Sequence, residues 1–381
     1  MKTAAKILTV IVPAYDMEGL LPRCLESLLV SGDRLPELEV VVVNDGSHDR
    51  TGEIAHGFAN RHPGVFRVVD KANGNYGSCI NAALPLATGF YVKVLDADDS
   101  VDTAAFGRLL AVLEEEAAKG DAATDLVVTD YFSVDPEETV LHRTGYRFPE
   151  GPDHHLSEMA DGDARFTIHS IVYRRSVFDT IGYRQTEGVS YTDTEWIIEP
   201  MVRVRRVRYL PVPVTKYLVG RSGQTMEAET YAARFQQVAD ITLGLAGRFE
   251  ERLGQCVPEA AAYYERQILR LVGSVYHACL FGVGGRRARC DLSAFDNRLR
   301  DISPHLYDAA GEIRFPSSHV PFRYVAAWRN QGIPGGAILL LIRGFLAAKA
   351  VGKTRPIGAV GGVRGFCRAI PLASRHRHET A

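Results

Sequence analysis

The first third of the chain alternates short apolar runs with amphipathic segments. Four runs rich in β-branched residues predict strands, at 6–12, 38–43, 65–69 and 90–95. Three segments between them carry apolar residues at helical spacing, at 17–30, 49–60 and 78–86. Strand–helix–strand alternation at this spacing predicts an α/β fold, with a doubly wound, mostly parallel sheet flanked by helices.

The rest of the chain divides into regions of different pattern. An amphipathic helix is predicted at 103–119 and strands at 126–131 and 166–173, with a polar His-, Pro- and Gly-rich excursion between them. Residues 228–300 have a mostly helical pattern, which predicts a helical C-terminal region. We therefore expect three parts: a catalytic domain at 1–226, a helical domain at 227–320 and a basic, partly apolar tail at 321–381.

Composition narrows the class of protein. The chain has 381 residues and a formal net charge of −2, which gives no general attraction to nucleic acid. Its six cysteines form no CxxC pair, which argues against a zinc or redox motif and favours a reducing, cytoplasmic location. The apolar run at 7–12 is too short for a signal peptide, and no stretch reaches the length of a membrane span.

The tail differs in charge from the rest. From residue 321 onward it has eight arginines and two lysines against one glutamate, a net charge of +9. Its apolar patches at 337–341 and 345–351 are broken by basic residues, a pattern that suits contact with the inner face of the plasma membrane. A packed terminal helix with solvated charges is an equal alternative. Nucleic-acid binding is disfavoured because few aromatic residues are placed for stacking.

Polar residues follow each of the first four predicted strands. The four segments are Pro13-Ala14-Tyr15-Asp16, Asn44-Asp45-Gly46-Ser47, the glycine-rich 71–77 and Asp96-Ala97-Asp98-Asp99. Since the carboxyl ends of parallel strands meet at one edge of a sheet, these residues are expected to meet and to bind a ligand there.

Two carboxylates two residues apart, Asp96 and Asp98, can converge on a divalent cation. Hard carboxylate oxygens suit Mg²⁺ or Mn²⁺, and phosphate oxygens of a substrate would complete the shell. An alternative is that Asp99 and Ser100 cap the helix predicted at 103. Capping accounts for Asp99 but leaves Asp96 and Asp98 unexplained.

The second and third loops give weaker signals. Asp45 can accept a hydrogen bond from a nucleobase, and Gly46 permits close backbone approach, although a plain turn has the same sequence. Asn73 and Gly74 begin a glycine-rich loop that opens a helix, where a phosphate would be favoured. The loop matches neither a dinucleotide fingerprint nor a Walker loop.

Four motifs in order, TVIVPAYD, VVVNDGSHDRT, KANGNYGSCINAAL and VKVLDADDS, resemble the nucleotide-sugar-binding half of glycosyltransferase family 2. The resemblance covers about residues 6–225. It implies the GT-A fold and the transfer of a sugar, with inversion, from a nucleotide-diphosphate donor to an acceptor hydroxyl.

The resemblance also implies roles for individual residues. The implied donor-binding residues are Pro13, Ala14 and Tyr15 around the nucleobase, Asp45 on the base, Asn73 and Gly74 in the donor loop, and Asp96 near the ribose and metal. Asp98 would ligate the metal as the second acid of the DXD motif. The sequence departs from the family where Asp16 replaces an asparagine and where Cys79 replaces an arginine two residues before Asn81.

A later segment is expected to supply the catalytic base. Asp193 matches the acid of the family's Glu-Asp motif, with Thr192 in place of the glutamate, and Glu195 is the alternative base. Either acid could instead serve only as helix N-terminal charge. Arg221 matches the segment that closes over the diphosphate, and a solvated turn is the equal alternative. His169 lies on an apolar run, which is typical of a core histidine.

These observations predict a metal-dependent glycosyltransferase of the hexosyltransferase type, working in cell-envelope, capsular or exopolysaccharide synthesis. A UDP-sugar is the favoured donor, and a saccharide or lipid-linked sugar the acceptor. A nucleotidyltransferase would need a glycine-rich basic loop after the first strand, where this chain has Pro13-Ala14-Tyr15-Asp16. A non-catalytic nucleotide-sugar-binding or scaffold protein remains the alternative.

Overall fold

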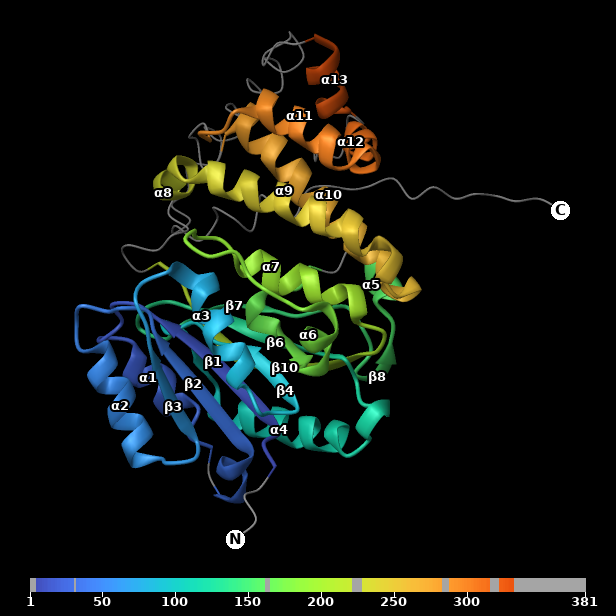
Figure 1. Ribbon diagram of the computed structural model, residues 1–381. Helices are drawn as coiled ribbons and strands as arrows, with labels where there is room; N and C mark the ends of the chain where they lie inside the picture. The colour runs from blue at the N-terminus through green and yellow to red at the C-terminus, as the bar shows by residue number, and fades with distance from the viewer. Residues whose placement is uncertain are drawn as a thin grey trace, which may run out of the picture. The chain divides into compact units, whose positions relative to one another are not determined.

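The computed structural model describes residues 5–30, 32–161, 165–220, 228–282, 288–315 and 322–331 (Figure 1). The chain folds into two compact units. The first comprises Met1–Ser222 and Arg252–Tyr264, and the second comprises Gly223–Glu251 and Glu265–Ala381. The first unit carries the sheet, and the second is helical.

The sheet has the strand order β3-β2-β1-β4-β9-β6-β10-β5, with β7 on β6 and β8 on β10. Its strands are β1 Leu8–Ala14, β2 Leu38–Asn44, β3 Phe66–Asp70, β4 Tyr91–Val94, β5 Ser100–Val101, β6 Leu126–Val134, β7 Val140–Thr144, β8 Gly151–His154, β9 Ile171–Arg174 and β10 Val207–Leu218. Strands β1 to β4 are parallel, as predicted, and β6 is parallel to β10. Strand β9 runs antiparallel between β4 and β6, so these two parallel groups share one carboxyl edge.

Both faces of the sheet are buried, which explains the continuous apolar runs of its first strands. Alternate residues of β1 and β2 point to opposite faces: Val10 and Val40 join one apolar cluster, whereas Ile11 and Val41 join the other. The helices of the first unit are α1 Leu21–Ser27, α2 Thr51–Arg61, α3 Asn75–Ala83, α4 Thr103–Ala117, α5 Leu156–Asp161, α6 Ser176–Ile181 and α7 Asp193–Ile198. Helices α1, α2 and α4 cover one face, and α3, α6 and α7 cover the other. The predicted α/β sheet flanked by helices is thus confirmed.

Short 3-10 turns connect several of these elements. They are η1 Gly32–Glu37, η2 Leu84–Leu86, η3 Gly120–Ala122, η4 Ile168–Ser170, η5 Glu199–Arg203 and η6 Leu253–Gln255. The structure differs from the predicted pattern at two places. The strand predicted at 166–173 is η4 followed by the shorter β9, and the polar excursion before it contains β7, β8 and α5, which extend the sheet.

The helix before β6 begins differently from the capping alternative. Asp102, not Asp99, is its N-cap, and the Asp102 carboxylate accepts from the backbone N–H of Ala105 at 2.9 Å. The side chain of Asp99 is buried and points elsewhere. Among the described contacts, the Asp96–Asp99 loop therefore does not cap α4.

The second unit is built from helices held by a buried polar cluster. Its helices are α8 Ala228–Ala233, α9 Phe235–Arg252, α10 Pro258–Phe281, α11 Leu292–Ile302, α12 Pro304–Gly311 and α13 Tyr324–Gln331, the ends of α9 and α10 belonging to the first unit. Asp296 accepts from the Tyr276 hydroxyl and from Arg329 Nε, the latter at 2.9 Å. No helix in the described ranges is long and apolar enough to cross a bilayer. The apolar tail patches at 337–351 lie outside the described residues.

A buried glutamate connects β2 to β1 and to the turn before β4. Glu39 is buried, and its Oε2 accepts from the Thr9 hydroxyl at 2.6 Å and from the Thr88 N–H at 2.8 Å. The Thr9 hydroxyl in turn accepts from the Gly89 N–H at 2.9 Å. This turn closes tightly on β1, because a Cβ on Gly89 would lie 2.4 Å from the Thr9 nitrogen.

Thr9→Val keeps the shape of the side chain but removes both hydrogen bonds. We expect it to lower the free energy of unfolding of the sheet unit by about 1–3 kcal/mol, because a buried carboxylate and an N–H lose a partner. Urea denaturation followed by tryptophan fluorescence measures the change. Thr103→Val, which removes an exposed hydroxyl contact to the Ser27 carbonyl, is the control. Equal stability of the two variants would contradict the expectation.

Candidate active site

The loops after β1 and β2 are joined by backbone hydrogen bonds to side chains. The Asp16 N–H donates to Ser47 Oγ at 3.1 Å, and Asp16 Oδ1 accepts from the His48 N–H at 2.8 Å. Asp16 has a φ of 52°, a conformation that aspartate tolerates better than most residues. Asp16 therefore has a local structural role at the position where it departs from the family's asparagine.

The three predicted nucleobase contacts lie at the end of β1. Pro13 and Ala14 are buried as its last residues, and Tyr15 is 41% exposed. The Tyr15 ring makes an edge contact with the His48 ring, with centroids 6.1 Å apart. Tyr15 is thus the member of the three whose side chain is open to a ligand.

Asp45 joins the loop after β2 to the glycine-rich loop. Its carboxylate is buried, and Oδ1 lies 2.5 Å from Lys71 Nζ and 3.0 Å from the Gly74 nitrogen. Gly46 has a φ of 73°, and a Cβ there would approach the Asn73 nitrogen to 2.8 Å. Asp45, Asn73 and Gly74, which the sequence assigns to the donor, are therefore brought together.

The acid-rich loop after β4 contains a buried carboxylate oxygen that makes no hydrogen bond within the described part of the chain. Asp99 Oδ1 accepts from the Leu218 N–H at 2.9 Å, but Asp99 Oδ2 has no hydrogen bond to any described residue. Oδ2 lies 3.1 Å from His169 Nδ1. Asp96, Asp99 and His169 each offer one ligand atom within 4.8 Å of the others. This set fits a divalent cation, whereas the sequence singles out Asp96 and Asp98.

Burial perturbs the titration of this cluster. Burial, together with the charges of Asp99 and Asp98, raises the pKa of Asp96 to about 7, although the Tyr76 hydroxyl opposes the shift by donating to Asp96 Oδ1 at 2.8 Å. Burial lowers the pKa of His169 to about 4, so its ring is neutral and able to ligate a metal at neutral pH.

Lys93 is the buried cation nearest to these acids along β4. Its Nζ donates to the His169 carbonyl at 3.0 Å, and burial lowers its pKa to about 8 despite the charges of Asp99 and Asp96. A charged residue inside an otherwise apolar strand is the signal by which the sequence could have pointed to it. His169 itself lies on η4, stacked on Tyr217 at 4.2 Å, and belongs to the acidic cluster instead of to an apolar strand.

Arg23 of α1 contacts the backbone of the acidic loop. Its Nη2 donates to the Asp98 carbonyl at 2.5 Å, and its Nη1 lies 3.6 Å from Glu138 Oε1. Glu138 also lies 3.8 Å from Lys216 of β10 and has a φ of 62°. Nothing in the local sequence around Arg23 indicates this contact, because its partners are distant in the chain.

Asp193 and Glu195, the two predicted bases, have different surroundings. Asp193 is the partly exposed first residue of α7, and burial raises its pKa. Its charge also helps to raise the pKa of the Tyr76 hydroxyl, after burial and the charge of Asp96. Glu195 is fully buried and accepts from the Thr186 N–H at 2.7 Å and the Thr186 hydroxyl at 2.8 Å.

The segment before α7 is packed onto α3. Asn81 Oδ1 accepts from the Gln185 N–H at 2.9 Å, and a Cβ on Gly77 would lie 1.9 Å from the Thr186 carbonyl oxygen. Only a glycine allows this approach. Asn81 thus positions the loop that leads to Asp193. Arg221, the predicted diphosphate contact, lies outside the described residues.

The comparisons with known proteins identify glycosyltransferases as relatives. Residues 9–182 match the family model described as "Glycosyl transferase family 2". The chain is 38% identical to the uncharacterized glycosyltransferase EpsJ of Bacillus subtilis over 109 residues, which is 29% of this chain and 31% of that protein. It is 28% identical to the uncharacterized glycosyltransferase YibD of Escherichia coli over 222 residues, 57% and 62% of the two chains. The chain thus spans less than two thirds of these curated relatives.

A third relative and a solved structure complete the comparison. The chain is 33% identical to the chondroitin synthase of Pasteurella multocida over 144 residues, 38% of this chain and 14% of the synthase. S. aureus TarS 1-349, solved in complex with UDP-GlcNAc, superposes with a TM-score of 0.60 at 18% identity, covering 80% of this chain and 83% of TarS. That likeness establishes the GT-A fold. Residues 9–182 therefore form a segment of the glycosyltransferase family 2 type.

Proposed function

We propose that this protein is an inverting, metal-dependent hexosyltransferase that moves a sugar from a nucleotide-diphosphate donor to an acceptor hydroxyl during synthesis of a cell-envelope, capsular or extracellular polysaccharide. The observation that carries the proposal is the cluster of Asp96, Asp99 and His169, in which the buried Asp99 Oδ2 atom has no hydrogen bond to a described residue. Relatives named as chondroitin and hyaluronan synthases support the polysaccharide product. TarS, whose structures hold UDP-GlcNAc and UDP, supports a UDP-sugar as the donor.

The donor is proposed to lie along the carboxyl edge of the sheet. Tyr15, beside Pro13 and Ala14, faces the nucleobase, and Asp45 fixes the loop of Asn73 and Gly74 against it. Asp96 and Asp98 are the proposed ligands of Mg²⁺ or Mn²⁺, with Asp99 and His169 adjacent to Asp96. The bound metal would neutralise the charge that develops on the departing diphosphate.

Asp193 is the proposed general base. Its carboxylate accepts the proton of the acceptor hydroxyl as that oxygen attacks the anomeric carbon and the bond from that carbon to the diphosphate breaks. A single displacement of this kind inverts the configuration at the anomeric carbon. Burial supports the assignment because a raised pKa makes Asp193 a stronger base. The carboxylate of Glu195 already binds Thr186, which favours a structural role for it.

The proposal extends to the place of the reaction. The tail from residue 332 onward lies outside the described residues, and its charge is the basis for proposing contact with anionic lipid at the inner face of the plasma membrane. A lipid-linked saccharide acceptor would then be within reach of a peripheral, cytoplasmic enzyme.

A donor screen tests the proposal as a whole. The purified protein is incubated with common nucleotide-sugars and Mg²⁺ or Mn²⁺, and release of nucleoside diphosphate is measured. Metal-dependent hydrolysis of one donor, lost in Asp98→Asn, supports the proposal and names the sugar. Binding of a donor without turnover under any condition favours the non-catalytic alternative. Absence of both binding and turnover contradicts the donor site itself.

Metal binding is expected to follow the protonation of Asp96. Its pKa of about 7 means that the carboxylate is protonated, and a poor ligand, below neutral pH. In the presence of UDP, the affinity for Mn²⁺ should rise about tenfold per pH unit up to pH 7 and then level off. Electron paramagnetic resonance of free Mn²⁺ measures it.

Tyr76→Phe is the matched variant for this test. It removes the hydrogen bond that stabilises the Asp96 carboxylate, so the plateau should move to higher pH. An affinity that does not change with pH between 5.5 and 8, or a plateau that stays in place in Tyr76→Phe, would show that Asp96 is not a ligand.

Asp193→Asn and Glu195→Gln should separate catalysis from structure. Asp193→Asn is expected to lower kcat by about 10²- to 10⁴-fold while UDP binding is retained, because an amide cannot accept the proton. Glu195→Gln should lower the free energy of unfolding by about 1–3 kcal/mol, because a neutral amide replaces a buried carboxylate whose hydrogen bonds from Thr186 are strengthened by its charge. Turnover assays, calorimetric UDP titration and urea denaturation are run on both. The assignment fails if Asp193→Asn keeps its kcat.

A further inference from the structure

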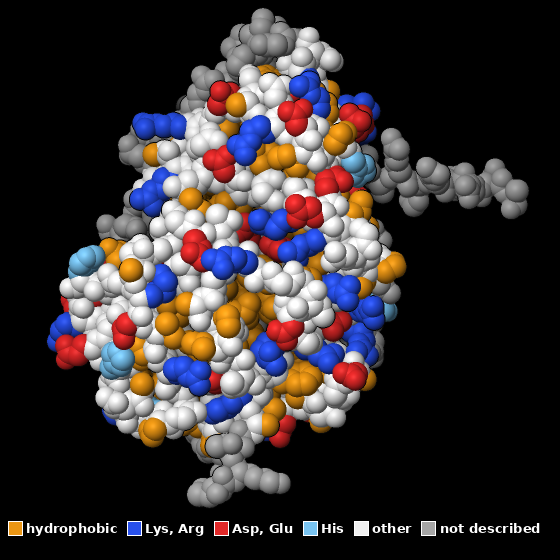
Figure 2. Space-filling view, viewed as in Figure 1, with side chains coloured by type: hydrophobic (Ala, Val, Ile, Leu, Met, Phe, Trp, Pro, Cys, Tyr) orange, Lys and Arg blue, Asp and Glu red, His pale blue; other side chains and the backbone are white. Residues whose placement is uncertain are grey.

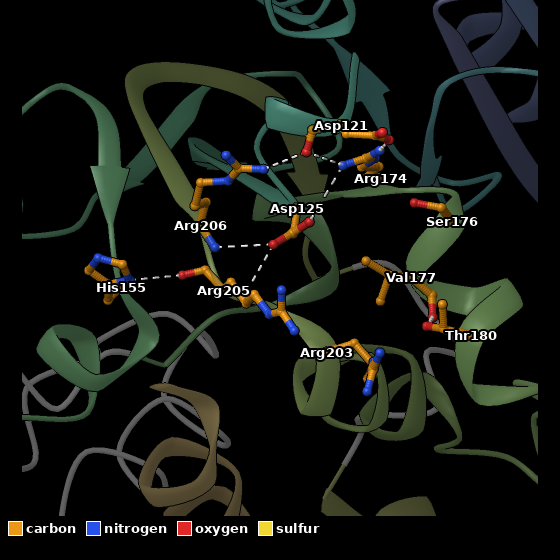
Figure 3. A pocket seen from close by; sticks show the side chains of 10 residues that line it. All are labelled: Asp121, Asp125, His155, Arg174, Ser176, Val177, Thr180, Arg203, Arg205 and Arg206. Carbon is orange, nitrogen blue, oxygen red and sulfur yellow. Dashed lines mark hydrogen bonds and ion pairs between the residues drawn. The ribbon is translucent and has the colours of Figure 1, made fainter. Parts of the chain in front are cut away.

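A polar pocket lies at the opposite edge of the sheet from the acidic cluster. Its volume is about 470 Å³, and its lining residues, all in the first unit, are Asp121, Asp125, His155, Arg174, Ser176, Val177, Thr180, Arg203, Arg205 and Arg206 (Figure 3). Asp125 comes directly before β6 and Arg206 directly before β10, at the amino ends of these parallel strands. The acidic cluster follows the carboxyl end of β4, so the two sites are separated by the length of the strands.

Four arginines and two aspartates line this pocket, and the aspartates do little to neutralise the guanidinium groups. Asp125 Oδ2 accepts from the backbone N–H groups of Arg205 and Arg206, at 2.9 and 3.1 Å, and Asp125 Oδ1 is 4.0 Å from Arg174. The Asp121 side chain is fully exposed and lies 3.4 Å from Arg174. Its charge is therefore screened by water.

The arginines are held mainly by neutral carbonyl groups. Arg206 Nη2 donates to the Asp121 carbonyl at 2.7 Å, and Arg174 Nη1 donates to the same oxygen at 3.3 Å. Arg203 Nη1 donates to the Gln255 carbonyl at 3.1 Å. Among the described residues, no ion pair joins Arg203 or Arg205 to an acid, so positive charge remains directed at the pocket.

Figure 2 shows acidic and basic side chains interspersed over the face in view, the usual pattern for a solvated surface.

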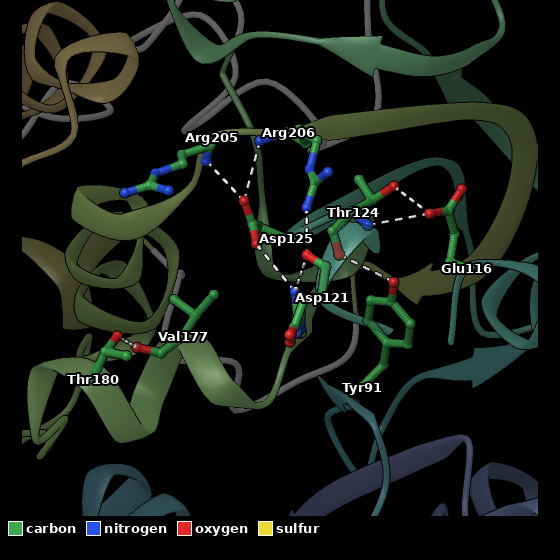
Figure 4. Close-up of polar contacts among 10 residues, drawn as sticks. Tyr91, Glu116, Asp121, Thr124, Asp125, Val177, Thr180, Arg205 and Arg206 are labelled. Carbon is green, nitrogen blue, oxygen red and sulfur yellow. Dashed lines mark hydrogen bonds and ion pairs between the residues drawn. The ribbon is translucent and has the colours of Figure 1, made fainter. Parts of the chain in front are cut away.

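Buried residues hold the segment that carries the Asp121 carbonyl in place (Figure 4). Glu116 Oε2 accepts from the Thr124 hydroxyl at 2.6 Å and from its N–H at 3.1 Å, and the Tyr91 hydroxyl donates to the Thr124 carbonyl at 3.0 Å. Both Glu116 and Tyr91 are buried. The pocket is thus organised before a ligand arrives, which reduces the entropy lost on binding.

We propose that this pocket binds the oxyanion of an acidic saccharide, a phosphate or carboxylate group carried on a sugar. Guanidinium groups bind both oxyanions through paired hydrogen bonds, and the Ser176 hydroxyl and the apolar Val177 side chain offer contacts suited to a sugar ring. The volume is that of a small-ligand site. The saccharide identity of the ligand rests on the proposed sugar-transfer function, whereas the anion preference rests on the pocket alone.

The test is titration calorimetry on the full chain, with UDP and Mg²⁺ saturating the donor site. Glucose 1-phosphate and glucuronate are the anionic probes, and glucose and inorganic phosphate are the controls. At least one anionic sugar should bind, and the stronger of the two identifies phosphate or carboxylate as the preferred group. The Arg203→Gln/Arg205→Gln variant should weaken that binding tenfold or more. The Arg61→Gln/Arg67→Gln variant, which changes two exposed arginines outside the pocket, should not.

Three results would overturn the proposal. In the first, the parent and the Arg203→Gln/Arg205→Gln variant bind the anionic sugar with the same affinity. In the second, glucose binds to the parent as tightly as the anionic sugar does. In the third, inorganic phosphate binds to the parent as tightly as the anionic sugar does. Donor hydrolysis is measured on the same preparations. Hydrolysis that persists while the anionic sugars fail to bind rejects the pocket alone. If the parent protein hydrolyses no donor, the proposed transferase is rejected. The anion site is then still tested by comparing anion binding between the parent and the arginine variants.

Discussion

The burial of negative charge at the end of β4 is the constraint on which the rest of the site depends. Asp99 is buried and Asp96 is half-buried, and desolvation raises the pKa of both carboxyl groups. The protein offsets only part of this cost, through the Leu218 N–H, the Tyr76 hydroxyl and the buried Lys93 ammonium. Among the described residues, the Asp99 Oδ2 atom is left without a hydrogen bond, 3.1 Å from His169 Nδ1, and the proposed cation would lie beside it.

The loops around this charge are held by one another more than by the sheet. Asp45 holds Lys71 and Gly74, Asp16 holds His48, and Arg23 reaches the Asp98 carbonyl. Each contact joins segments that follow different strands. A donor bound here would meet backbone groups and side chains already in place, which lowers the conformational entropy that binding costs.

One sheet presents two chemically opposite edges. Acidic side chains gather beyond the carboxyl end of β4, and arginines gather before the amino ends of β6 and β10. Both arrangements depend on β9, which runs antiparallel between β4 and β6. The end of β9 therefore places Arg174 at the arginine edge, and η4, which precedes β9, places His169 at the acidic edge. The connection between the two halves of the sheet therefore supplies a residue to each site.

The sequence by itself determined the parallel half of the sheet and the loops that follow its strands. Short apolar runs rich in β-branched residues favour strands buried on both faces, and a local pair such as Asp45 and Gly46 carries its own turn geometry. The tertiary structure alone decided that Asp99 and His169 join Asp96, that Asp102 caps α4, that Glu195 binds Thr186, and that Arg23 holds the acidic loop. These partners are brought together by strand order and packing across long separations in the chain, and no local spacing encodes such contacts.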